Sequence, residues 1–220
     1  MTHKLPLCLL STLLAVACSS GLKYKVDDAA LDNVSSGEKQ GVFTAKNDVE
    51  VANSEMRNAQ SQLDALDRDR DVAKNEKKQA DLEVEKADTE EQSAVASRDE
   101  NRHNAAKHGK EVASFGVKVA DAKLDWLDQK EDALKAAKSA AEAHQKAAEA
   151  KTEFEKAKLA QQKNIKPSSD FSVGDYESQW KDKNSDWESA KKDAESEQKK
   201  ATDREQKWKD LVAQHQKLRG

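Results

Sequence analysis

Residues 42–66 read VFTAKNDVEVANSEMRNAQSQLDAL, and small or apolar side chains recur there at alternating steps of three and four residues. This spacing is a seven-residue repeat, typical of a helix that packs one face against a partner helix. The repeat keeps its phase far beyond this stretch. Its later members include Ala73, Ala80, Ala87, Ala94, Val112, Phe115, Val119, Trp126, Ala133, Ala140, Ala147, Phe154 and Ala157. We therefore predict a coiled-coil helix over about residues 42–164.

The composition favours helix over disorder. Of 220 residues, 36% are charged and 36% are hydrophobic, and the chain contains seven Gly and two Pro. Ala, Lys, Glu and Gln dominate, and these residues are strong helix formers. A formal net charge of only −4 is low for a disordered chain of this polarity. Charges of both signs alternate without a basic face, which argues against nucleic acid as a partner.

Gly109 and Gly116 raise the question whether this long stretch folds back on itself. A polar turn near residues 101–110 would produce such a reversal. A loop resets the phase of a repeat arbitrarily, whereas here the phase is the same on both sides of the glycines. We therefore favour one continuous helix, which would extend about 185 Å at 1.5 Å per residue.

A second stripe of small and apolar residues begins near Gly116 and runs beside the first. Its members are Ala113, Ala120, Leu127, Leu134, Ala141 and Ala148, with Val117 and Leu124 next to them. A helix with two apolar stripes usually has more than one neighbour. We expect one neighbour from this chain and another from a second copy or a different protein.

Pro167 ends the long helix, because proline disfavours helical geometry at the residue before it. A turn over about residues 165–174 leads into a last helix over about 175–218, with Ser172 or Asp175 as its N-cap. The predicted fold class is all-α. It is a helical hairpin in which the shorter last helix runs antiparallel to the long coiled-coil helix.

Three Trp side chains on one stripe of the last helix complement the Ala-rich long helix in size. Small residues let two helices approach closely, and large rings fill the space that Ala leaves open. The antiparallel arrangement pairs Trp180 with Phe154 and Ala157, Trp187 with Ala147 and Ala150, and Trp208 with Trp126 and Ala133. We predict that this interface is formed by Trp126, Phe154, Trp180, Trp187 and Trp208. A ligand or sugar platform is the alternative interpretation of the Trp stripe.

The first eighteen residues have the pattern of an export signal. Lys4 supplies a positive charge, an apolar run follows over residues 5–16, and small residues and then Cys18 end the pattern. A run this short fits a secretory signal better than a membrane span. The pattern resembles the bacterial lipoprotein signal peptide, whose lipobox ends in small residues followed by Cys. Ala15 stands where that family prefers Leu.

The resemblance implies that residues 1–17 are removed and that Cys18 carries diacylglycerol and an amino-terminal acyl chain such as palmitate. Ser19 then implies sorting to the outer membrane, with the chain facing the periplasm and residues 18–41 forming the lipidated Cys and a tether. An ordinary signal peptide cut before Cys18 is the alternative, which leaves a free thiol. Cys8 is lost in both cases, so the mature monomer has no disulfide.

The sequence lacks the motifs of catalysis and of cofactor binding. His103 and His108 are five residues apart and do not share a helical face. Gly-rich phosphate loops, Cys pairs and the Ser nucleophile elbow do not occur. We therefore predict a protein that is not an enzyme and that has no catalytic residues, metal site, cofactor or small-molecule substrate.

We expect a membrane-anchored coiled-coil lipoprotein that serves as a structural spacer or a protein-binding adaptor in the periplasm. Its partners would be the membrane, through lipid on Cys18, and a second copy or another envelope protein. The layout is similar to that of Braun-type lipoprotein rods, although that family ends in a Lys joined to peptidoglycan and this chain ends Lys217-Leu218-Arg219-Gly220. A periplasmic holdase chaperone resembling the Skp-like type is the alternative, and the acidic pI of about 5.8 weakens it.

Overall fold

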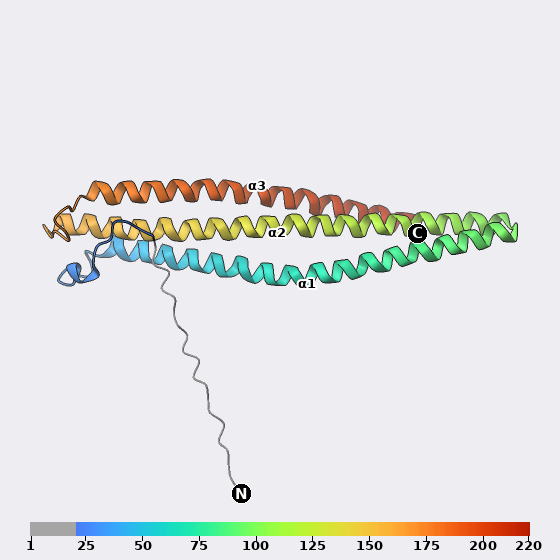
Figure 1. Cartoon of the computed structure of the whole chain (residues 1–220), viewed down its shortest axis with the longest axis horizontal. Coiled ribbons are helices and arrows are strands. Elements are labelled where there is room, and N and C mark those ends of the chain that lie inside the picture. Colours follow the sequence, from blue (N-terminus) through green and yellow to red (C-terminus); the bar gives the residue numbers. More distant parts are fainter. Residues whose placement is uncertain (1–20) are drawn as a thin grey trace, which may run out of the picture.

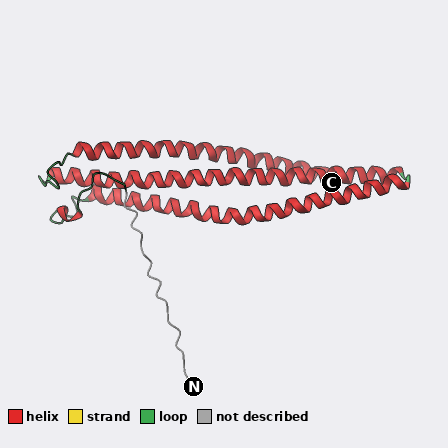
Figure 2. Cartoon of the chain, in the orientation of Figure 1, coloured by secondary structure: helices red, strands yellow, loops and turns green. Residues whose placement is uncertain are grey.

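The computed structural model describes residues 21–220, which form an all-α fold (Figure 2). The elements in chain order are the 3₁₀ helix η1 (Asp28–Leu31) and the α-helices α1 (Gln40–Ser97), α2 (Glu100–Gln162) and α3 (Val173–Arg219). The all-α class and the antiparallel last helix are confirmed, and Ser172 occupies the N-cap position of α3. The predicted signal peptide, residues 1–17, and the lipidation site Cys18 lie outside the described residues.

The prediction of one continuous helix over residues 42–164 is wrong. The chain reverses direction at Arg98 and Asp99, just before the stretch that we had weighed as a turn. Arg98 adopts the left-handed conformation, with φ 57° and ψ 21°, and ends α1. The Asp99 side chain accepts a hydrogen bond of 3.1 Å from the Arg102 amide and caps α2. The rod is therefore about 95 Å long, set by the 63 residues of α2 at 1.5 Å per residue.

The helices α1 and α2 pack along small residues spaced seven apart. The buried members are Ala45, Ala52, Ala59, Leu66, Ala73, Ala87 and Ala94 on α1, and Ala113, Ala120, Leu127, Leu134, Ala141 and Ala148 on α2. Cross-helix contacts hold one antiparallel register throughout, from Lys151 with Asp48 to Lys110 with Asp88. The second stripe of α2 thus faces α1, so both stripes are covered by helices of this chain.

The helices α2 and α3 are joined by stacked rings. Phe154 stacks on Trp180 with ring centroids 5.4 Å apart, and Trp126 stacks on Trp208 at 4.9 Å, as the antiparallel pairing predicted. Trp187 stacks on His144 at 4.2 Å. Further rings, Phe115 and His215, stack nearer the end of α3. Trp187 had been placed against Ala147 and Ala150, so its ring lies about one helical turn from the expected position.

The three long helices form an open layer with α2 in the middle (Figure 1). Within the described residues α2 packs against both α1 and α3, whereas α1 and α3 do not contact each other. The hairpin of α1 and α2 continues beyond the last residue of α3, so the tip consists of two helices (Figure 1). Because α1 and α3 flank α2 on opposite sides, each face of the layer leaves part of α2 uncovered between them.

Replacing Trp187 with Ala should lower the free energy of unfolding by about 3 kcal/mol, because the stack on His144 is lost and a cavity remains. Chemical denaturation followed by far-UV circular dichroism measures this loss. Val95→Ala is the matched control, since Val95 is 59% exposed and its truncation should change the stability little. An unfolding curve for Trp187→Ala that superimposes on that of the parent protein would contradict the stacking role.

Candidate functional site

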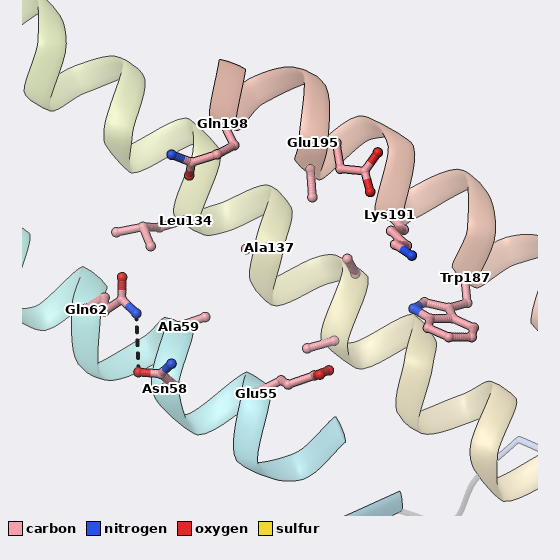
Figure 3. Close-up of a pocket in the computed structure, with 13 residues that line it drawn as sticks. Glu55, Asn58, Ala59, Gln62, Leu134, Ala137, Trp187, Lys191, Glu195 and Gln198 are labelled. Carbon is pink, nitrogen blue, oxygen red and sulfur yellow. Dashed lines mark hydrogen bonds between the residues drawn. The ribbon is translucent and has the colours of Figure 1, made fainter. Parts of the chain in front are cut away.

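A hollow of about 580 Å³ opens between α1 and α3 on one face of α2, and we call it the front groove (Figure 3). Its floor is formed by Ala59, Leu134, Ala137, Ala140, Ala141 and Ala194. Its walls are formed by Glu55, Asn58 and Gln62 on α1 and by Trp187, Lys191, Glu195 and Gln198 on α3. The site therefore combines a floor of small apolar side chains with a polar rim.

The front groove exists because the rings on α3 are interrupted. The stripe that carries Trp180 and Trp187 continues with Ala194 and Ala201 before the next ring, Trp208. Where α3 presents Ala194, three of the four groove residues of α2 are also Ala, namely Ala137, Ala140 and Ala141. Packing at native density requires large side chains opposite small ones. The middle of the layer therefore lacks the bulk that fills the same position toward both ends of α3.

His144 closes one end of the front groove and links all three long helices. Its ring stacks on Trp187 of α3, and its Nδ1 atom lies 3.0 Å from Oε2 of Glu55 on α1. A smaller hollow of about 230 Å³ continues the groove on the far side of this ring pair. On the rim, Lys191 and Glu195 make no ion pair or hydrogen bond with other described residues, so their charges remain available to a partner.

The chemistry of the groove suits the binding of another helix. A floor of Ala allows the backbone of another helix to come close, and amide, carboxylate and ammonium groups on the rim can bond to polar side chains of that helix. Over residues 21–220, no cluster of three or more His, Cys, Asp or Glu side chains could hold a metal ion. Over the same residues, no helix is long and apolar enough to cross a membrane.

The opposite face of the layer is crossed by residues 22–34, which we call the strap. Residues 18–41 were expected to be a tether, but the strap is docked, and Val26, Leu31 and Val34 are buried in one apolar cluster. This cluster also contains residues of all three long helices, namely Val42, Ala157, Leu159, Ala160 and Tyr176. The first part of the strap is extended, and η1 follows it.

Side chains of α2 and α3 bind the backbone of the strap. Gln179 accepts from the Lys23 and Tyr24 amides at 2.8 and 3.0 Å and donates to the Tyr24 carbonyl at 3.1 Å. The hydroxyl of Tyr176 donates to the Lys25 carbonyl at 3.1 Å. Because these bonds use backbone groups, they fix the path of the chain whatever the strap side chains are.

A buried ammonium group holds the centre of the strap. The Lys156 side chain is only 8% exposed, and its Nζ lies 2.7 Å from Asp28 Oδ1 and 2.8 Å from Glu153 Oε1. Glu153 also accepts from the Val26 amide at 2.6 Å. Burial alone would lower the pKa of Lys156, but the hydrogen bonds to Asp28 and Glu153 outweigh burial and raise it. The hydrogen bond from Lys156 likewise lowers the pKa of Asp28.

These two pKa shifts define where the strap is most stable. Asp28 has a lowered pKa when folded, so its contribution is present above its usual value of 3.8 and is lost as the pH falls through the folded value. Lys156 has a raised pKa, so its contribution is present below 10.5 and is lost as the pH rises through the folded value. The ion pair therefore supports the strap across the neutral range.

The sequence-predicted residues occupy the interface between α2 and α3, and one of them also reaches the groove. Trp126, Phe154, Trp180 and Trp208 stack within that interface, while Trp187 both stacks there and lines the groove. Sequence reasoning missed the strap and the groove rim. The apolar residues Val26, Leu31 and Val34 in a polar stretch were the available signal for the strap. Comparisons with protein-family models, with curated proteins and with solved structures found no match to this chain.

Replacing Lys156 with Met should loosen the strap, because Met keeps the volume of the side chain and leaves the partly buried Glu153 carboxylate without its cation. We expect faster hydrogen exchange over residues 22–34, measured by mass spectrometry at neutral pH. Lys46→Met is the matched control. Lys46 lies 3.5 Å from the other oxygen of Asp28, but both side chains are largely exposed, so its removal should change exchange little. Equal exchange in the two variants would contradict the role of Lys156.

Proposed function

We propose that this protein is a non-enzymatic adaptor of the outer membrane, anchored by lipid on Cys18, that binds an α-helix of a partner envelope protein in the front groove. The open groove between α1 and α3 is the observation that carries the proposal. It offers an added helix the same chemistry that α2 offers to α1, namely a floor of small side chains. An added helix there would convert an open layer into a closed four-helix arrangement.

The dimensions and chemistry of the groove favour an adaptor over a bare spacer. Helix recognition in a groove uses apolar anchors at helical spacing along one face of the ligand. Apart from Leu134, the α2 residues of the floor around Ala137 are Ala, so a Leu or aromatic residue of the partner can fill the groove as Trp187 and Trp208 fill neighbouring positions. The rim residues Lys191 and Glu195 then select a partner helix with charges of both signs.

The anchoring part of the proposal comes from the sequence pattern that ends in Cys18. Several acyl chains on one Cys give stable attachment, whereas a single chain gives only marginal binding. Such an anchor would keep the adaptor at the membrane although no helix over residues 21–220 could span it. Docking of the strap, which begins four positions after Cys18, fixes the bundle close to that anchor.

Photo-crosslinking in cells tests the groove. A photoreactive residue at Gln62 or Gln198, on the two walls, should give one discrete product of higher mass that is lost in a Cys18→Ala background. The matched control places the same residue at Glu142, which is exposed and lies two positions from His144, on the other side of α2. Equal products from groove and control positions would contradict a groove-specific partner. A broad ladder of outer-membrane proteins would instead support the holdase alternative.

Filling the groove should abolish binding without unfolding the protein. Ala137 is exposed on the groove floor, so Ala137→Trp adds a ring in open space and should leave the melting temperature unchanged. The crosslinked product from Gln62 should disappear in this variant. Its persistence at the parent level, with the fold intact, would show that the partner does not occupy the groove.

A further inference from the structure

The strap first meets the bundle on the side of the rod and not at its end. We call the surface around this entry point, formed by Leu22, Phe43 and Lys46, the flank. Leu22 lines a hollow of about 520 Å³ together with Phe43 and Lys46 of α1 and Thr152 of α2. Thr152 lies about 15 Å along the helix axis from Gln162, the last residue of α2, and the turn into α3 extends further. Figure 1 shows the strap, in dark blue, crossing α2 at some distance from that end.

The chain between the strap and Cys18 is too short to pass the end of the bundle. Leu22 comes four positions after Cys18, and a fully extended chain of four steps spans at most about 14 Å. From Leu22 the strap runs toward the end of the bundle, since Leu31 and Val34 pack beside Leu159 and Ala160. To reach the end of the bundle near Gln162, the segment between Cys18 and Leu22 would have to run fully extended beside the strap. Its length of about 14 Å would be used up before it passed that end.

The flank around this entry point has the chemistry of a membrane-contact surface. Phe43 is 48% exposed and lies beside Leu22 in the hollow, with Lys46 on its rim. Aromatic and aliphatic side chains with neighbouring Lys suit the interface of a bilayer, where the ammonium group extends to the headgroups. Glu50 and Glu149 line the same hollow, so the flank carries no strong positive charge. Its affinity for lipid would come from the tether, which raises the local concentration.

We propose that, while the strap is docked, the bundle lies flat against the bilayer on the face of the layer that carries the strap. The surface around Leu22 and Phe43 then faces phospholipid. This inference rests on the proposed function through the lipid on Cys18. Its consequence is that the tip at Arg98 lies near the membrane, whereas an upright rod about 95 Å long would hold the tip far above it.

The same orientation turns the front groove away from the membrane. Lys151 lines the hollow that continues the groove, and Glu153 binds the strap. Two residues of α-helix correspond to a rotation of about 200°, so these side chains point to opposite faces of the layer. A bundle that rests on the strap side therefore presents the groove to the periplasm, where a partner helix can reach it.

Neutron reflectometry of a supported phosphatidylcholine bilayer tests the orientation. The chain from Cys18 onward is coupled through its single thiol to a maleimide lipid, at low surface density. A flat layer of helices should give a protein film about 10–12 Å thick, the diameter of one helix. A film about 95 Å thick, the length of α2, with the strap intact would overturn the proposal.

Two variants assign the orientation to the strap and to the flank. Gln179→Ala combined with Lys156→Met removes the hydrogen bonds and the ion pair that hold the strap. This double variant should thicken the film, because the freed strap lengthens the tether. Phe43→Glu should thicken the film with the strap still docked, whereas Leu82→Glu, at a residue 62% exposed elsewhere on α1, should not. Films of equal thickness for all variants would overturn the role of the strap.

Chemical coupling separates this test from the proposed function. Because the lipid is attached in vitro, the film thickness does not depend on whether cells lipidate Cys18. Failure of the adaptor function would appear as loss of the groove-specific crosslink while the thin film persists. Failure of the orientation would appear as a thick film while the crosslink persists.

Discussion

The structure depends on how closely α1 can approach α2. A close approach requires small side chains at the positions that face the other helix. The sequence supplies Ala at nearly every seventh position of both helices. Leu66, Leu127 and Leu134 add bulk only in the middle of the interface, where they form a local apolar cluster. Because Ala loses no side-chain entropy on burial, such an interface is assembled at low entropic cost. On its other side α2 packs through aromatic rings, so one helix supports two different kinds of contact.

Much of this architecture could be predicted from local sequence. The repeat defined the helices, Pro167 marked the second turn, and the antiparallel register placed Trp180 and Trp208 on Phe154 and Trp126. The first turn could not be predicted from the same signals. It contains neither Gly nor Pro, the residues that usually mark a turn. Arg98 itself adopts the left-handed conformation and Asp99 caps the next helix. The unchanged phase misled us, since the repeat resumes on the face of α2 that packs against α3.

The strap and the groove depend on distances that no local pattern contains. Gln179 lies about 155 positions from the backbone groups that it binds, and Glu153 lies 127 positions from Val26. Both residues look like ordinary members of a charged helix surface in the sequence. The groove is equally invisible there, because it appears only once α1 and α3 are known to flank α2 without touching. In the sequence, Ala194 is one member of the stripe that carries the Trp residues. In the structure it lines the floor of the groove.

The separation of α1 from α3 has a thermodynamic consequence. Every contact of α3 with the rest of the long helices runs through α2, and the same is true of α1. Substitutions on the outer two helices can still share a partner side chain. Glu55 and Trp187 converge on His144, and Lys123 pairs with Glu76 of α1 while its ammonium group lies 5.9 Å from the centroid of the Trp208 ring of α3. Energetic effects of distant sites without shared partners add, whereas those of groups that share a partner do not. Substitutions around His144, Lys123 or the strap should therefore be energetically coupled across the layer, whereas substitutions on α1 and α3 that are far from these contacts should have additive effects on stability.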